Sequence, residues 1–312
     1  MRILVTGGNG FIGSHLVDRL TAIGEKVTVL DLYPRIYGDL SKEVHFIQGT
    51  LNDMPLINRT LEDHRIDVVY HTAWSTIHET ALKDPSADIQ SNLLASINLL
   101  NACRETGVHR VIYLSSGGTV YGMSNSLPIS ECHPTNPINP YGITKLAVEK
   151  YLQMYYYLYG IEYIIFRPSV PYGPRQNPLR RQGVISTFIY QALAGKKLTI
   201  WGDGGATRDY FYIEDLIDVI INAAGEKFTS NEAIYNLGGM RPYCINELLD
   251  QIAQVLSLNL QVEYLPARRF DVPHLWLDSR LALQKFGWQP KVFLEEGIQR
   301  TSEWLKNWSD NL

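Results

Sequence analysis

The stretch Ile3-Leu4-Val5-Thr6-Gly7-Gly8-Asn9-Gly10-Phe11-Ile12-Gly13 stands near the start of the chain and decides its fold. Its apolar first half is typical of a strand that is covered on both faces, and the amphipathic segment that begins at Phe11 predicts a helix. Further strands of the same kind are expected at 27–30, 67–70, 111–114 and 163–166. Helical patterns separate these strands, so the chain is predicted to be an α/β protein with a doubly wound parallel sheet, a Rossmann fold.

The second half of the chain is less regular than the first. Glycine and proline interrupt it from Arg167 onward, although helical patterns persist near 184–194, 214–224, 245–256 and 294–308. A length of 312 residues suggests about two domains. We expect a Rossmann domain over 1–166, to which elements near 210–238 return, and a smaller C-terminal α/β lobe over 167–312.

Composition excludes several classes of protein. The 28 basic and 32 acidic residues leave a net charge of −4, which argues against non-specific nucleic-acid binding. No stretch approaches the roughly 20 apolar residues that a membrane span needs, and the short apolar start is no signal peptide. Three widely separated cysteines predict neither a disulfide framework nor a metal site. We therefore expect a cytoplasmic protein without a metal, and without a membrane or nucleic-acid partner.

The three glycines Gly7, Gly10 and Gly13 predict a dinucleotide-binding loop. Glycine at these positions permits a tight turn and a close approach to a pyrophosphate, which then faces the free N–H groups of the helix start. Asp31 lies 18 residues after Gly13, at the end of the second strand, where a carboxylate can bind the adenosine ribose hydroxyls. That charge repels a 2′-phosphate, so the sequence favours NAD over NADP. The alternative is that Arg35 pairs with the 2′-phosphate of NADP.

Tyr141 and Lys145 are predicted to share one face at the start of a helix, because they stand four residues apart. A nearby ammonium favours the phenolate and should lower the pKa of the tyrosine. Ser115 and Ser116 follow a strand and are expected to meet Tyr141 at the carboxyl edge of the sheet, where such folds bind ligands. The sequence therefore predicts a catalytic tyrosine and lysine at that edge.

Three motifs together resemble a known family. They are Thr6-Gly7-Gly8-Asn9-Gly10-Phe11-Ile12-Gly13, Ser115-Ser116-Gly117-Gly118-Thr119-Val120-Tyr121-Gly122 and Tyr141-Gly142-x-x-Lys145. The combination is similar to the extended short-chain dehydrogenase/reductases, and most similar to the nucleotide-sugar epimerases typified by UDP-glucose 4-epimerase. The resemblance extends to the late segments 208–213 and 286–290.

The resemblance implies an NAD-dependent epimerase that inverts C4 of a UDP-sugar through a 4-keto intermediate. Tyr141 is then the base, Lys145 holds the nicotinamide ribose, and Arg208 and Arg268 bind the diphosphate of the substrate. The cofactor-binding residues implied are Gly7, Gly10, Phe11, Ile12, Gly13, Asp31, Leu51, Ala73, Asn92, Ser115, Tyr141 and Lys145. The tyrosine-rich helix after Lys145 implies a homodimer, because aromatic residues are enriched at interfaces.

Several positions depart from the family pattern. Gly117 replaces the usual serine, so Ser116 or Thr119 must supply the hydroxyl that binds the sugar, and Ser116 is favoured. Trp74 places a bulky ring where the family has alanine. The alternatives are a dehydratase, a decarboxylase or a reductase of the same family, or a non-catalytic NAD-binding relative. Gly118 and Thr119 argue against the first two, since those enzymes carry acids there.

Overall fold

The computed structural model describes residues 1–180, 183–226, 233–268 and 272–309. These residues form two compact units. The first unit comprises 1–120, 135–167 and 217–235, and the second comprises 121–134, 168–216 and 236–312.

A seven-stranded sheet forms the centre of the first unit, in the order β10-β6-β5-β4-β1-β2-β3. Neighbouring strands from β6 to β3 run parallel. The strands are β1 (Arg2–Thr6), β2 (Lys26–Asp31), β3 (His45–Gln48), β4 (Val68–His71), β5 (Arg110–Leu114), β6 (Glu162–Pro168) and β10 (Ile234–Leu237). The order reverses between β1 and β4, as expected for a doubly wound sheet. The predicted fold class is therefore confirmed.

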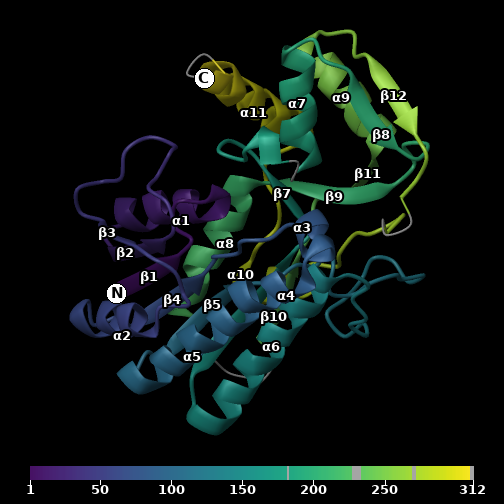
Figure 1. Cartoon of the computed structure of the whole chain (residues 1–312). Coiled ribbons are helices and arrows are strands. Elements are labelled where there is room, and N and C mark those ends of the chain that lie inside the picture. The colour runs from purple at the N-terminus through teal and green to yellow at the C-terminus, as the bar shows by residue number, and fades with distance from the viewer. Residues whose placement is uncertain (181–182, 227–232, 269–271, 310–312) are drawn as a thin grey trace. The chain divides into compact units, whose positions relative to one another are not determined.

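Helices cover both faces of this sheet (Figure 1). Three helices, α2, α5 and α6, pack side by side on one face, and α1 and α8 lie on the other (Figure 1). The helices are α1 (Phe11–Ala22), α2 (Met54–Asp63), α3 (His78–Lys83), α4 (Pro85–Asp88), α5 (Ala95–Thr106), α6 (Pro140–Tyr159) and α8 (Ile213–Gly225). A π-helical segment, η1 (Ile89–Leu94), joins α4 to α5. Because both faces are covered, β1, β4 and β5 are buried almost throughout.

The register of the parallel strands gathers the residues of the site at one edge. Thr6 pairs with His71, and His71 pairs with Tyr113. Leu114 pairs with Phe166 on the next strand. Each of these residues stands at or near the carboxyl end of its strand, so the loops after β1, β4 and β5 all begin at the same edge.

The second unit contains two small sheets and four α-helices in its described part. The three-stranded sheet has the order β11-β9-β7, and the two-stranded sheet pairs β12 with β8. Their strands are β7 (Val170–Tyr172), β9 (Thr207–Tyr212), β11 (Pro242–Cys244), β8 (Leu198–Trp201) and β12 (Val262–Leu265). The helices are α7 (Val184–Leu193), α9 (Ile245–Leu256), α10 (Arg280–Phe286) and α11 (Leu294–Ser309), with a 3₁₀ turn, η2, at Pro178–Arg180.

The predicted strands and helices are all present. The five strands expected from apolar runs are β1, β2, β4, β5 and β6, and the four late helical patterns are α7, α8, α9 and α11. Strand β3 was not predicted, because His45–Gln48 is only half-buried. Strand β10 falls within the elements near 210–238 that were expected to return to the first domain, but it was not identified as a strand, because Ile234–Leu237 is a short strand at the sheet edge. The π-helical turn at Ile89–Leu94 was not predicted either, because its sequence has an ordinary helical pattern.

We expect Gly13→Ala to destabilise the protein, because a Cβ at Gly13 would overlap the carbonyl oxygen of Gly7. Overpacking of this kind costs about 1–3 kcal/mol of unfolding free energy. Gly225→Ala is the matched control, since nothing lies near its added Cβ and its φ is not positive. Thermal and urea unfolding of both variants measures the difference. Equal stability of the two variants would contradict the close approach of α1 to the glycine loop.

Candidate active site

The glycine loop after β1 packs closely against the loop that follows β4. Gly7 has φ +69°, and a Cβ there would stand 2.7 Å from the Cα of Ala73. Gly10 is the N-cap of α1 and donates its N–H to the Gly7 carbonyl at 3.1 Å. The first turn of α1 holds no acidic side chain, so its free N–H groups and the helix dipole favour an anion. Phe11 and Ile12 supply N–H groups of this turn.

Asp31 stands beside this loop at the end of β2. Its carboxylate accepts from the backbone N–H groups of Asn9 at 2.9 Å and Tyr33 at 3.1 Å. Arg35 does not point to a phosphate site, because its guanidinium forms a bidentate pair with Asp18 at 2.6 Å and is almost fully buried. A glycine cradle, an acid-free helix start and a nearby carboxylate are the groups that a dinucleotide such as NAD requires.

A buried histidine ties β1 to β4 at this edge. His71 Nδ1 lies 2.9 Å from the Thr6 hydroxyl, and Nε2 lies 2.8 Å from the Ser96 hydroxyl. Burial lowers the pKa of His71 to about 3, and the charge of Lys145 acts in the same direction. His71 is therefore neutral and structural. Thr6 also accepts from Thr72 and from the N–H of Ala73, which fixes the loop that follows β4.

Asn92 holds the next part of that loop from the π-helical segment η1. Its Oδ1 accepts from the N–H of Ser75 at 3.0 Å, and its Nδ2 donates to Thr76 at 2.9 Å and to Asp88 at 2.8 Å. Asp88 is fully buried and also accepts from the Thr144 hydroxyl of α6 at 2.5 Å. The loop 72–76 is thus anchored on both sides of Trp74.

The start of α6 carries Tyr141 into this region. Asn139 caps the helix by accepting from the Gly142 N–H at 2.8 Å, and Pro140 occupies the first turn. Gly142 permits the helix to pack against the loop after β5, because a Cβ there would stand 2.8 Å from the Thr119 carbonyl oxygen. Tyr141 is 8% exposed. The structure therefore brings Tyr141 and Thr119 together at the same edge.

Lys145 lies one turn further along α6 and is buried. Its Nζ donates to the Leu114 carbonyl at 2.7 Å. The ammonium also stands 3.7 Å from the ring centroid of Trp74, 5.0 Å from that of Tyr113 and 5.9 Å from that of Tyr141. Burial lowers the pKa of Lys145 to about 7, although the nearby carboxylates Glu149 and Asp88 raise it. The charged form is therefore present below about pH 7 and is lost as the pH rises.

The pKa of Tyr141 is not lowered, contrary to the prediction from the sequence. Burial raises the pKa of Tyr141 above its ordinary value, and the Asp88 carboxylate acts in the same direction. Desolvation disfavours the phenolate here more than the Lys145 ammonium favours it. The i, i+4 spacing predicts the neighbouring lysine correctly, but it does not account for the burial of both groups.

The serines and threonine after β5 take different places. Ser115 is buried and donates to Glu149, which pairs with Arg167 at 2.5 Å. Thr119 donates to the Ser116 carbonyl at 3.4 Å. Ser116 is half-buried, and its hydroxyl is bound to no side chain in the described part of the chain. Ser116 therefore has the freer hydroxyl of the two candidates.

The remaining predicted site residues contact other parts of the chain. Leu51 is buried after β3, and its carbonyl accepts from the Asn98 side chain at 3.2 Å. Arg208 and Arg268 belong to the second unit. Arg208 donates to the carbonyls of Thr207 at 2.6 Å and Val272 at 2.7 Å, and Arg268 lies over the Trp201 ring at 5.3 Å.

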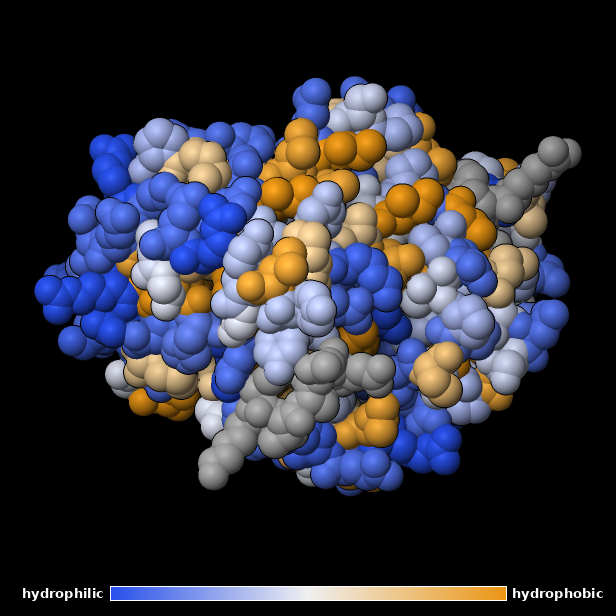
Figure 2. Space-filling view, turned by 90° about the horizontal axis from the view of Figure 1, so that it is seen from below, coloured by the Kyte–Doolittle hydropathy of each residue, from blue (hydrophilic) through white to orange (hydrophobic). Residues whose placement is uncertain are grey.

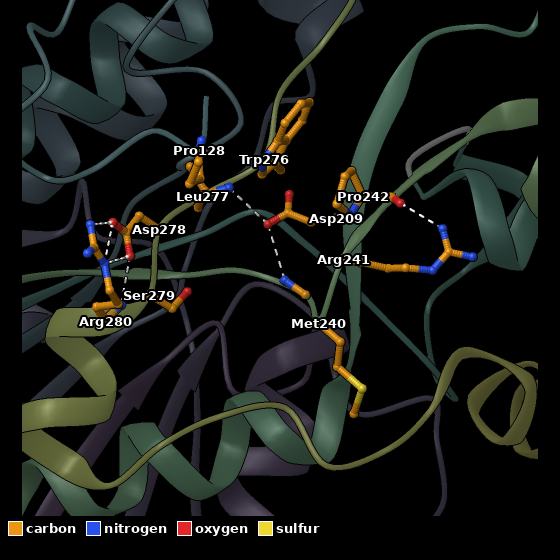
Figure 3. Close-up of a pocket in the computed structure, with 11 residues that line it drawn as sticks. Pro128, Asp209, Met240, Arg241, Pro242, Trp276, Leu277, Asp278, Ser279 and Arg280 are labelled. Carbon is orange, nitrogen blue, oxygen red and sulfur yellow. Dashed lines mark hydrogen bonds and ion pairs between the residues drawn. The ribbon is translucent and has the colours of Figure 1, made fainter. Parts of the chain in front are cut away.

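A hollow of about 550 Å³ lies in the second unit (Figure 3). One of its lining residues, Asp209, directly follows Arg208 in the chain. The Asp209 carboxylate in its wall accepts from the N–H groups of Gly239 and Leu277, both at 3.1 Å (Figure 3). Burial raises the pKa of Asp209 to about 7. Arg208 and Asp209 together connect β9 to the segments around 239 and 272–277, so both residues help to stabilise the second unit.

Sequence reasoning missed four contributors to the site. Asp88, Tyr113 and Glu149 surround Lys145 or Tyr141, and Gly142 permits helix α6 to approach Thr119. Glu149 could have been found, because it stands four residues after Lys145 on the same helix face. Asp88 and Tyr113 carry no local signal, since long-range packing alone brings them to the site.

Known proteins resemble the chain over almost its whole length. The profile of the NAD dependent epimerase/dehydratase family matches residues 3–238. The UDP-glucose 4-epimerase of Mycolicibacterium smegmatis is 36% identical, covering 98% of this chain and 99% of that protein.

Two solved structures have the same fold as this chain. The UDP-glucose 4-epimerase of Thermotoga maritima, with UDP-glucose, has a TM-score of 0.93 and 34% identity over 99% of this chain and 100% of that one. The Thermus thermophilus enzyme, with NAD, has a TM-score of 0.90 and 34% identity over 98% of this chain and 99% of that one. None of the helices in the described ranges combines the length and apolar composition that a bilayer crossing demands. The chain belongs to the NAD-dependent epimerase/dehydratase family.

Proposed function

We propose that the chain is an NAD-dependent epimerase that inverts C4 of a UDP-sugar. The observation that carries the proposal is the placement of Tyr141 and Lys145 at the sheet edge onto which the glycine loop opens. The relatives named UDP-glucose 4-epimerase are similar over the whole chain, and one solved relative holds UDP-glucose. Uridine as the carrier and C4 as the inverted carbon rest on these relatives.

Tyr141 acts as the base that takes the proton from the C4 hydroxyl and later returns it. Bound NAD would supply the carbon that accepts the C4 hydride and returns it to the other face of the 4-keto sugar. Lys145 favours the phenolate of Tyr141 by its charge and has N–H groups left for the cofactor ribose, since Leu114 accepts only one. Burial of both side chains excludes water from the reacting atoms.

Ser116 binds the reacting sugar oxygen in this proposal, with Thr119 as a second donor. The free Ser116 hydroxyl favours this order, because Thr119 already donates to the Ser116 carbonyl. Arg208 and Arg268 bind the diphosphate of the substrate. Asp31, Leu51 and Ala73 contact the cofactor, and Asn92 acts through the loop that it anchors.

The alternatives within the family are disfavoured at the 116–119 turn. Dehydratases and decarboxylases need an acid to eliminate water or to handle a carboxylate, and Gly118 and Thr119 supply none. A decarboxylase is among the relatives, at 30% identity. Asp31 disfavours a reductase that draws on NADPH, and the presence of Tyr141 and Lys145 disfavours a non-catalytic relative.

A homodimer through α6 is part of the proposal. This helix exposes Ile143, Leu158 and Tyr157, the last 85% exposed, and Arg104 of α5 lies over the Tyr159 ring at 5.2 Å. Figure 2 shows apolar residues grouped between hydrophilic ones on one face of the molecule. Exposed aromatic and apolar groups of this kind mark interfaces, and sedimentation equilibrium can test the dimer.

The three free cysteines favour a cytoplasmic location.

Tyr141→Phe is expected to lower turnover of UDP-glucose by about 100-fold or more, because the ring remains but the proton acceptor is lost. NAD binding should persist, since the hydroxyl is not needed to hold the cofactor. A coupled assay of UDP-galactose formation measures turnover, and the absorbance of protein-bound NAD is the control. Activity within a few-fold of the unaltered enzyme would mean that another residue is the base.

The protein is expected to bind NAD more tightly than NADP by about tenfold or more, since a hydrogen bond to a charged group contributes about 1.5–3 kcal/mol. Asp31→Asn should shrink this preference, because the acceptor remains while the charge is lost. Asp63→Asn, a distant exposed position on α2, should leave both affinities unchanged. Calorimetric titration gives the constants, and tighter binding of NADP by the unaltered protein would refute the assignment of Asp31.

Ser116→Ala is expected to lower kcat by about tenfold, and Thr119→Val by less, with NAD retained in both. The reason is that the Ser116 hydroxyl is free for the sugar whereas the Thr119 hydroxyl already has a backbone acceptor. Steady-state kinetics of the two single variants measures the difference. A larger loss in Thr119→Val would reverse the two roles, and no loss in either would leave Tyr141 as the only contact to the reacting oxygen.

A further inference from the structure

The Lys145 ammonium lies against the face of an aromatic ring that the family pattern lacks. Its Nζ is 3.7 Å from the Trp74 ring centroid and 5.0 Å from that of Tyr113. A cation over an aromatic face within about 6 Å is attracted by the ring quadrupole, and most strongly where water is excluded. Lys145 is 5% exposed, so the condition of exclusion holds here.

The backbone on both sides of Trp74 is anchored by hydrogen bonds. The Thr6 hydroxyl accepts from the N–H of Ala73, just before the ring, and Asn92 accepts from the N–H of Ser75, just after it. The ring also stands edge-on to Tyr141, with centroids 5.8 Å apart. Because both neighbouring residues are hydrogen-bonded to the sheet edge or to η1, the backbone that carries the ring is anchored beside Lys145.

The ammonium needs this partner because its other charged neighbours are already engaged. Glu149 is bound by Arg167 and Ser115, and Asp88 is bound by Thr144 and Asn92. These two carboxylates still favour the charged amine, while burial disfavours it. His71 faces the amine as a neutral ring, the Leu114 carbonyl accepts its hydrogen bond, and the rings of Tyr113 and Tyr141 stand nearby.

We propose that Trp74 is a positioning residue for Lys145. The face of the Trp74 ring holds the Lys145 ammonium beside Tyr141 and keeps the ammonium charged. The role of Lys145 in turnover rests on the proposed epimerase function, whereas the contact itself does not. Trp74 thus replaces, with its π-face, the hydration that burial removes from the ammonium. Tyr113 forms the second wall of this aromatic cage.

Two variants of Trp74 separate this role from simple filling of space. Trp74→Leu keeps an apolar side chain but removes the π-face, and Trp74→Phe keeps a smaller π-face. We expect Trp74→Leu to lower the pKa of Lys145 by about one unit, and Trp74→Phe to restore most of it. If the ring only excluded water, the smaller leucine would admit water and the pKa of Lys145 would rise instead.

The pKa is measured by NMR on the full chain labelled with ¹³C at the lysine Cε, before and after addition of NAD. The Lys145 resonance is the one that is absent from Lys145→Met. An unchanged or raised pKa in Trp74→Leu, or a lowered pKa that Trp74→Phe does not restore, would overturn the proposal. This titration requires no turnover, so it gives an answer even if the epimerase assay fails.

Kinetics supply a second, independent reading in the holoenzyme. If the ammonium is needed, the fall of kcat with rising pH should begin about one pH unit lower in Trp74→Leu than in the unaltered enzyme. Trp74→Phe should lie between the two. A profile that drops uniformly in Trp74→Leu, without a shift along the pH axis, would indicate a packing defect and contradict the proposal. Absence of epimerase activity in the unaltered protein would refute the proposed function alone.

Discussion

The close approach of the loops after β1 and β4, with no Cβ between them, is the constraint on which the site depends. A side chain at Gly7 would meet the Cα of Ala73 at 2.7 Å. Because the two loops touch, the carbonyl and hydroxyl of Thr6 can bind Thr72 and Ala73. The same close approach at Gly7 fixes the start of the loop that carries Trp74. The proposed cofactor site and the aromatic cage around Lys145 therefore depend on one backbone contact.

Buried charge is the second organising feature of this edge. Asp88, Lys145 and Glu149 are all at most 5% exposed, and an unpaired charge at such depth would be strongly destabilising. Each carboxylate is instead saturated by donors, Asp88 by Thr144 and Asn92, and Glu149 by Arg167. The carboxylates hold elements together through these bonds and act on Lys145 only through space. Among the described residues, the Lys145 ammonium meets the Leu114 carbonyl and the rings of Trp74, Tyr113 and Tyr141.

Much of the fold could be predicted from the sequence, because it depends on local patterns. Apolar runs identify β1, β2, β4, β5 and β6, since strands covered on both faces show no alternation. The glycine loop is also a local pattern, because the backbone geometry that a pyrophosphate needs restricts residue type, and its role in cofactor binding together with Asp31 belongs to the proposed function. Strand β3 could not be predicted in this way, because a half-buried edge strand has no distinctive pattern. Its place in the sheet depends on pairing with β2 alone.

The electrostatics of the site were less predictable than its residues. Helical spacing places Tyr141 beside Lys145, and it implies a lowered pKa for the tyrosine. Burial reverses that expectation, because it disfavours the charged form of either group, raising the pKa of the acid and lowering that of the base. A charged lysine favours the phenolate, because the ammonium stands 5.9 Å from the Tyr141 ring centroid. A fixed π-face on the ammonium is one of the few ways to favour that state without adding a carboxylate, whose negative charge would disfavour the phenolate as Asp88 already does.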